Sequence, residues 1–158
     1  MKLTTKGRYA VQAMADLAAQ GPREPVALPD IALRQGISLG YLEQLFAKLK
    51  RAGLVESNRG VSGGYNLARA ACDIRVSEVV AAVDEEIRTT ACEPGSGKSC
   101  NGTSARCLTH DLWDELGRQI DIFLNAVSLE DVLERRVLGL AAVNSPQRQR
   151  QQYVGAAE

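Results

Sequence analysis

Three cysteines and the only histidine of this 158-residue chain lie close together, at Cys92, Cys100, Cys107 and His110. Successive members of this set are separated by seven, six and two residues. Thiolate and imidazole groups are ligands of soft and borderline metal ions, so the four side chains could share one metal centre. The residues between them are mainly Gly, Ser, Thr and Asn, which favour a loop over a packed core. We therefore expect a loop over 87–107 that a bound metal orders.

The spacing distinguishes between kinds of metal centre. Structural zinc prefers two ligands a few residues apart, and only Cys107 and His110 have that spacing here. A [2Fe–2S] cluster needs two ligands on each of its two irons, which the wide spacing of Cys92 and Cys100 suits better. A neutral imidazole in place of one thiolate makes ligation pH-dependent and weakens cluster retention, as a sensor requires. A [4Fe–4S] cluster held by the three cysteines and a structural zinc ion are the alternatives.

Other residues near the set are weaker ligand candidates. Glu93 and Asp111 adjoin the ligands and could replace His110 as the fourth. Cys72 stands far from the loop in sequence and follows two alanines, so we expect it to be a buried thiol without a metal.

The first half of the chain carries the pattern of a DNA-reading domain. Residues 5–20, 29–35 and 38–51 have apolar residues at helical spacing. The last two segments are joined by Gly36-Ile37-Ser38, where Ser38 is a natural N-cap. Two short helices joined in this way form a helix-turn-helix, in which the second helix is offered to the major groove.

The segment 38–51 has two distinct faces. Its predicted buried stripe consists of Leu42, Leu45, Phe46 and Leu49. The complementary face carries side chains able to meet base edges and phosphates, namely Tyr41, Glu43, Gln44, Lys48 and Arg51.

A β-hairpin is expected directly after this helix. Residues 54–57 and 65–67 alternate like strands around a glycine-rich turn over 58–64, which contains Arg59. A hairpin in this position is a wing, and its tip can place Arg59 in the minor groove or on phosphates. The turn lacks the lysine and the following helix of a P-loop, so we exclude nucleotide binding.

The second half of the chain predicts helices that extend the first domain. Ser77 is a predicted cap for a helix to about residue 84, and Ser128 with Asp131 resembles a capping box before a short helix. The longest helical pattern covers 108–127, and its apolar stripe needs a partner. We expect the same helix of a second subunit as that partner, with burial against the first domain as the alternative.

The fold class that follows is mainly α, a winged helix-turn-helix domain with a β-hairpin wing plus a long C-terminal dimerisation helix. We expect the DNA-binding domain over 1–86, the loop over 87–107, the dimerisation helix and a short helix over 108–143, and a disordered tail over 144–158.

Charge and length agree with this division. Residues 1–70 carry ten basic and five acidic side chains, whereas residues 71–158 carry nine and fourteen, which is typical of a nucleic-acid-reading module joined to another unit. No signal peptide or membrane span is evident, so we expect a cytoplasmic protein without a membrane partner. No set of residues typical of a substrate site is evident, which argues against an enzyme, a small electron carrier and a small-molecule substrate.

Several strings resemble the IscR type of winged-helix iron–sulfur regulators. They are Met1 to Ala10, Gln35 to Ser38, Tyr41 to Phe46, Gly53 to Val55, Arg59-Gly60 with Gly63-Gly64-Tyr65, and Cys107-Leu108-Thr109-His110. The likeness spans about residues 1–140. The N-terminal strings are shared with nitric-oxide and iron sensors of the wider family, whereas the string over 107–110 is more particular to the IscR type.

The resemblance implies a homodimeric transcription factor that binds double-stranded DNA. It also implies a [2Fe–2S] cluster on Cys92, Cys100, Cys107 and His110, control of cluster-assembly genes, and cluster-assembly scaffold proteins as further partners. In this type a serine is common where the chain has Gly40, so one hydrogen bond to DNA is lost and backbone freedom is added.

DNA contacts are expected from Thr4, Lys6, Arg8, Ser38, Tyr41, Glu43, Gln44, Arg59 and Gly60. Glu43 is unusual among them, because a carboxylate near phosphates is unfavourable unless it accepts a hydrogen bond from a cytosine amino group. Glu43 could therefore discriminate between DNA sites, and an ordered loop over 89–107 could shift that choice.

Overall fold

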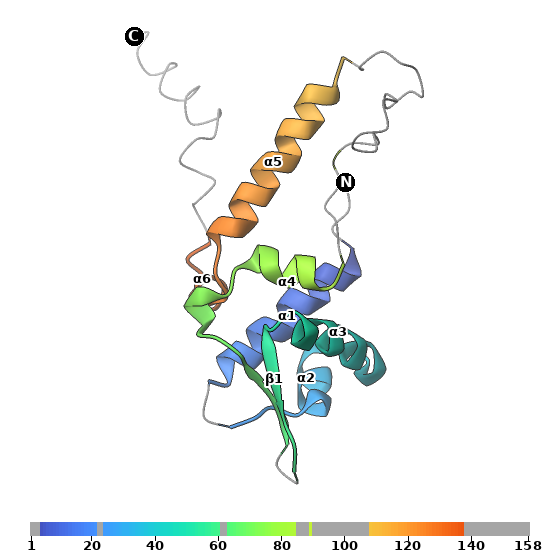
Figure 1. The fold of residues 1–158 in the computed structure, drawn as a ribbon, viewed down its shortest axis with the longest axis vertical. Coiled ribbons are helices and arrows are strands. Elements are labelled where there is room, and N and C mark those ends of the chain that lie inside the picture. Colours follow the sequence, from blue (N-terminus) through green and yellow to red (C-terminus); the bar gives the residue numbers. More distant parts are fainter. Residues whose placement is uncertain (1–3, 22–23, 61–62, 85–88, 90–107, 138–158) are drawn as a thin grey trace, which may run out of the picture.

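The structure is a computed structural model that describes residues 4–21, 24–60, 63–84, 89 and 108–137. The helices are α1 (Thr5–Ala19), α2 (Leu28–Gln35), α3 (Leu39–Arg51), α4 (Val76–Ala82), α5 (His110–Ala126) and α6 (Leu129–Leu133). A short 3-10 helix, η1 (Ala71–Asp73), and two strands, β1 (Val55–Asn58) and β2 (Gly64–Leu67), complete the described elements. Figure 1 shows α1 to α4 packed together, the hairpin extending from them on one side and α5 directed away on the other.

The predicted winged helix-turn-helix is confirmed. Helices α2 and α3 are joined by Gly36-Ile37-Ser38, and the antiparallel strands β1 and β2 follow with Val55 paired to Leu67 and Asn58 paired to Gly64. A third segment joins this hairpin, because Val26 and Tyr65 exchange backbone hydrogen bonds of 2.9 and 2.8 Å. The sequence did not predict this bridge, because a single extended residue between two helices leaves no strand-like alternation in the sequence.

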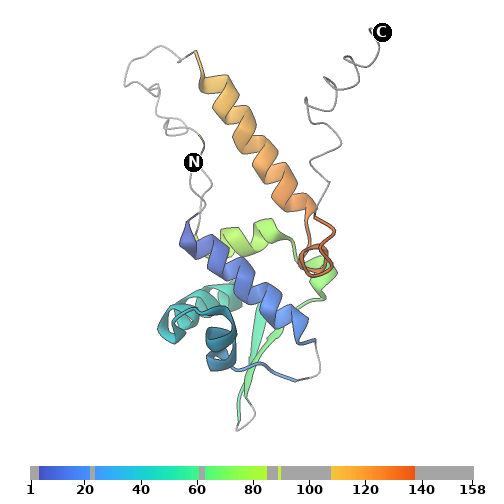
Figure 2. The same cartoon turned by 180° about the vertical axis from the view of Figure 1, so that it is seen from behind.

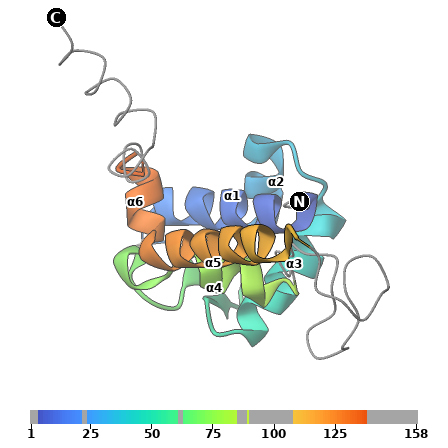
Figure 3. The ribbon, with the colours of Figure 1, turned by 90° about the horizontal axis from the view of Figure 1, so that it is seen from above.

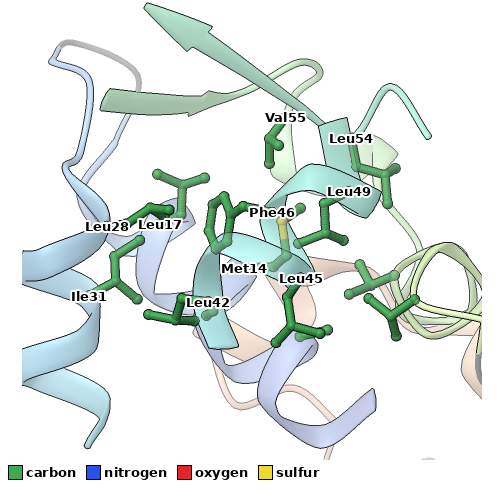
Figure 4. Close-up of a cluster of buried hydrophobic side chains, with 14 of the residues drawn as sticks. Met14, Leu17, Leu28, Ile31, Leu42, Leu45, Phe46, Leu49, Leu54 and Val55 are labelled. Carbon is green, nitrogen blue, oxygen red and sulfur yellow. The ribbon is translucent and has the colours of Figure 1, made fainter. Parts of the chain in front are cut away.

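The core of the winged-helix domain lies between α1, α3 and the hairpin. All four predicted core residues of α3 are at most 2% exposed, namely Leu42, Leu45, Phe46 and Leu49. Figure 4 shows them packed around Met14, with Leu17, Ile31 and Leu54 nearby. Burying each such side chain stabilises the fold by about 1.5–3 kcal/mol, so the apolar stripe fixes which face of α3 remains outside.

A buried ion pair orients α2 against α1. Asp16 is buried on α1 and accepts a forked pair of hydrogen bonds from Arg34, the shorter being 2.6 Å, and a further bond from Gln35. Burial alone would raise the pKa of Asp16, but the hydrogen bonds from Arg34 and Gln35 and the charge of Arg34 outweigh it and lower that pKa. The pair therefore links the first helix of the helix-turn-helix to the domain core.

Two expectations around α4 were wrong. Arg75 rather than Ser77 is the N-cap of α4, and Glu78 accepts a 2.8 Å hydrogen bond from the Arg75 N–H. The hydroxyl of Ser77 donates instead to Asn125 of α5 at 2.7 Å. Cys72 is exposed in η1, because Ala71 beside it supplies the side chain that packs against the core.

Helix α5 is joined to the winged-helix domain at its C-terminal end. The Val76 N–H donates to the Val127 carbonyl at 2.9 Å, and the Leu129 N–H donates to the Ile74 carbonyl at 3.0 Å. Val127 and Leu129 are buried there, whereas no residue of α5 itself is buried. Figure 2 shows α5 rising away from the domain, and Figure 3 shows it passing over α1 and α4.

The short helix α6 begins with the predicted capping box. Ser128 Oγ accepts from the Asp131 N–H at 3.1 Å, and Asp131 Oδ2 accepts from the Ser128 N–H at 3.0 Å. Both bonds of the motif are therefore present, with Asp131 in place of the longer Glu. None of the helices in the described ranges has the length and apolar character needed to cross a bilayer.

Candidate nucleic-acid interface

The outer face of α3 presents the predicted reading residues. Glu43 and Gln44 are exposed, and Tyr41 is half-buried because its ring packs edge to face against Tyr9 of α1. The two ring centroids lie 6.0 Å apart with an interplanar angle of 82°. Since the opposite face of α3 lies in the core, this face is the one available to a partner.

The Tyr9 contact places the N-terminal end of α1 beside α3. Thr4 is the N-cap of α1, and its Oγ1 accepts a 3.3 Å hydrogen bond from the Lys6 N–H. Thr4 and Arg8 are exposed, and Lys6 is half-buried. These three expected phosphate contacts therefore come from the start of one helix that adjoins the reading helix.

The tip of the hairpin carries the wing residues Arg59 and Gly60, which are both exposed. Gly60 has φ of +127°, a conformation that L side chains rarely adopt, and its carbonyl accepts a 3.0 Å hydrogen bond from the Gly63 N–H. A Cβ on Gly64 would lie 2.5 Å from the Val26 carbonyl oxygen, so glycine there permits the bridge between the wing and residue 26. The glycines thus shape the wing and leave the Arg59 side chain exposed to solvent.

The start of α3 differs in one detail from expectation. Ser38 is the N-cap by position, but its hydroxyl makes no capping hydrogen bond, and the residue is exposed. A Cβ on Gly40 would meet no atom within 4 Å. The first turn of α3 consequently has room for a serine at position 40, as in the resembling regulators.

Lys48 is held by a residue that sequence reasoning missed. Its Nζ lies 2.6 Å from Oδ2 of Asp84, which follows Val83, the C-cap of α4, and has φ of +55°. The hydrogen bond from Lys48, and then its charge, lower the pKa of Asp84, and the charges of Lys6 and Arg51 lower it further. No sequence signal placed residue 84 beside residue 48, because their contact depends on how α4 packs against α3.

The predicted ligand set is only partly within the described residues. Cys92, Cys100 and Cys107 lie outside them, and among the residues that are described no three His, Cys, Asp or Glu side chains gather as a metal site. His110 is half-buried and is the first residue of α5. Thr89, three residues before Cys92, lies against Gly117 of α5. A Cβ added to Gly117 would be 2.6 Å from Oγ1 of Thr89.

A family model described as Rrf2, iron-dependent transcriptional regulator, matches residues 3–135. The chain belongs to the Rrf2 family. Its similarity to one Rrf2 relative, the HTH-type transcriptional regulator IscR of Vibrio atlanticus (strain LGP32), is 53% identity over 134 residues, which is 85% of this chain and 76% of that protein.

Two solved structures are similar to this Rrf2 chain. T. potens IscR is 39% identical with a TM-score of 0.70 and covers 86% of this chain and 88% of its own. CymR, the global cysteine regulator of B. subtilis, is 29% identical with a TM-score of 0.72, and the match covers 85% of this chain and 98% of the CymR chain. The resemblance to IscR-type regulators is thereby confirmed, and the chain is a DNA-binding transcriptional regulator of the Rrf2 family.

Proposed function

We propose that this Rrf2 regulator is a cytoplasmic homodimer that senses iron–sulfur cluster status and controls cluster-assembly genes. It reads double-stranded DNA through its winged helix and holds a [2Fe–2S] cluster on Cys92, Cys100, Cys107 and His110. The observation that carries this proposal is the position of His110. It begins the helix whose other end is hydrogen-bonded to the DNA-reading domain.

The proposed DNA contacts follow from the exposed surfaces. Tyr41 and Gln44 meet base edges in the major groove, where the amide of Gln44 suits adenine. Arg59 reaches the minor groove or a phosphate from the wing, and the open backbone at Gly60 lets the wing approach the duplex closely. Phosphates are contacted by Ser38 and by the residues at the start of α1, which are Thr4, Lys6 and Arg8.

The donor set fits an iron–sulfur cluster. Three thiolates and one imidazole supply the four ligands that two irons need, and an imidazole gives the set one negative charge fewer than a fourth thiolate would. When bound, such a cluster supplies a redox-sensitive centre whose loss follows cellular iron and oxidant conditions. An imidazole ligates through a nitrogen that carries no proton, so acid should weaken retention of the cluster.

Helix α5 connects the ligand residue His110 to the DNA-binding domain. His110 is at one end of α5, and at the other end Ser77 and Val76 of α4 bond to Asn125 and Val127. α4 in turn supplies Val79 and Val83 to the core that supports α3. Ordering of the ligand segment therefore acts on a helix that is tied to the DNA-binding domain, and affinity for DNA changes only if the two states bind it differently.

The exposed apolar side chains of α5 support the homodimer. Leu112, Trp113 and Phe123 are respectively 62%, 43% and 36% exposed, which is a large apolar surface for a helix in water. Leu124, near the C-terminal end of α5, packs on the domain against Val76 and Val80. A second copy of α5 related by a twofold axis would cover the remaining face.

Two other metal centres are candidates for the same ligands. A [4Fe–4S] cluster on the three cysteines would make the protein an iron or nitric-oxide sensor. The tight spacing of Cys107 and His110 favours a structural zinc ion and a constitutive DNA-binding protein.

Anaerobic purification with visible absorption and assays of iron and acid-labile sulfide tests the proposal. We expect a coloured protein with two irons and two sulfides per chain, and a His110→Ala variant that loses the cluster faster on exposure to oxygen. Four irons per chain would support the [4Fe–4S] sensor, and zinc without sulfide would support the structural ion. Colourless, iron-free protein after attempted reconstitution would contradict every cluster proposal.

A further inference from the structure

The Lys48–Asp84 ion pair lies at the edge of the proposed DNA surface. Lys48 follows Gln44 by four residues and Tyr41 by seven, so the three side chains lie along one face of α3. Its ammonium group is nevertheless directed to α4, where Nζ is 2.6 Å from Oδ2 of Asp84. The first cation along this line of α3 therefore already has a carboxylate partner.

Asp84 is surrounded by basic side chains from two other elements. Besides Lys48, the charges of Lys6 on α1 and Arg51 on α3 act on its carboxylate, and together they lower its pKa. The hydrogen bond to Asp84, and then the charge of Asp84, raise the pKa of Lys48 against burial and the charge of Arg51, which lower it. One acidic side chain thus offsets a cluster of three basic ones.

The position of Asp84 is specified by the backbone. Its N–H donates to the Ala81 carbonyl at 3.0 Å, and its φ of +55° is a left-handed conformation that Asp and Asn tolerate better than other side chains. The Asp84 side chain is 75% exposed, whereas that of Lys48 is 30% exposed. A carboxylate so accessible to solvent is also accessible to the field of DNA phosphates.

We propose that Asp84 is an affinity-determining residue, which withholds Lys48 from DNA phosphates and so limits sequence-independent binding. A phosphate and the Asp84 carboxylate compete for the same ammonium group, and the carboxylate itself repels the duplex. The pair thus weakens binding to every sequence by the same factor. A larger share of the remaining binding free energy then comes from the base contacts made by Tyr41 and Gln44. The inference rests on the proposed orientation of α3 toward DNA and does not involve the metal.

Binding of cluster-free protein to a fluorescent duplex of mixed sequence, measured over a range of salt concentrations, tests this role. Asp84→Asn keeps the size of the side chain and its tolerance of positive φ, so the fold should be retained, as thermal unfolding will verify. We expect it to bind DNA several-fold more tightly than the parent at about 50 mM salt. The advantage should shrink about threefold by 200 mM, as one added phosphate contact requires.

Two further variants identify the cause of that gain. Asp73→Asn removes the same charge from η1, which packs against α6, and should leave affinity and salt dependence close to those of the parent. In a Lys48→Ala background, Asp84→Asn should give a clearly smaller gain, because only the repulsion between the carboxylate and the duplex is then removed and no cation is released. Equal behaviour of the Asp84 and Asp73 variants, or an undiminished gain without Lys48, would overturn the proposal. If the parent itself fails to bind any duplex, the proposed reading surface fails instead.

Discussion

Tyr9 and Tyr41 meet edge to face across the junction of α1 and α3, with ring centroids 6.0 Å apart. Tyr9 follows the segment of Thr4, Lys6 and Arg8, and Tyr41 stands in the first turn of α3. The contact therefore fixes the expected phosphate-binding residues relative to the reading residues. A ring pair of this geometry contributes about 0.5–1.5 kcal/mol beyond the area that it buries.

Substitution of Tyr41 separates its structural role from its proposed DNA contact. Tyr41→Phe keeps the ring against Tyr9, so the free energy of unfolding should change by less than about 0.5 kcal/mol. The variant should nevertheless bind DNA about tenfold more weakly than the parent, because the proposed hydrogen bond between the Tyr41 hydroxyl and DNA is lost. Tyr41→Ala should lower both stability and affinity in denaturant and DNA-binding titrations. A Phe variant that binds like the parent would remove the hydroxyl from the reading set.

Arg59 should matter for DNA binding and not for stability. It is exposed at the wing tip, so Arg59→Ala should leave the unfolding temperature unchanged. The affinity for DNA should fall about tenfold, and the slope of its salt dependence should fall by about one. Arg118→Ala, which removes the same charge from α5, is the matched control and should bind as the parent does. Indistinguishable binding by the two variants would place the wing away from the duplex.

The pair of Asp16 and Arg34 predicts how stability depends on pH. Because the folded-state pKa of Asp16 is lowered, the pair stabilises the fold fully above the ordinary aspartate pKa of about 4. That contribution is lost as the pH falls through the lowered value. Asp16→Asn should therefore be less stable than the parent by about 2 kcal/mol at pH 7, and the difference should shrink in acid.

Denaturant titrations between neutral and acidic pH measure this difference. Glu56→Gln serves as the control, because it removes a carboxylate at an exposed position of β1, outside the core. Parallel stability curves for the parent and the Asp16 variant would show that the ion pair is not the source of the acid sensitivity.

The apolar surface of α5 predicts the oligomeric state. Leu112 is 62% exposed, so Leu112→Glu should not disturb the fold of one subunit but should bury a charge in the proposed dimer. Light scattering coupled to size exclusion should report a dimer for the parent and a monomer for the variant. Arg118→Gln makes α5 more negative by the same one charge on the opposite face of the helix and should remain dimeric. A monomeric parent would contradict the assigned role of α5.

Much of the winged-helix domain could be predicted because its signals are local. The stripe from Leu42 to Leu49 and the capping box at Ser128 both depend on spacings within a few residues. The cap of α4 was misplaced because Ser77 is a common capping residue, whereas Glu78 makes the bond through the backbone of Arg75.

Contacts between distant elements could not be predicted in the same way. The bridge of Val26 to Tyr65 and the ion pair of Lys48 with Asp84 join segments that have no shared pattern. Cys72 was expected to be buried because its neighbours are apolar, yet the turn of η1 directs Ala71 inward instead. Of the proposed metal site, the described residues include only His110, so the ligand set stays a prediction.

The central claim, that cluster occupancy changes how the protein binds DNA, is tested by comparing cluster-loaded and cluster-free protein on the same duplexes. Duplexes are first selected from a random pool with each form, and affinities of both forms for each selected sequence are then measured anaerobically. We predict that at least one sequence distinguishes the forms by about 5–150-fold, and that Glu43→Ala reduces this difference. Equal affinities of the two forms for every selected sequence would contradict the account.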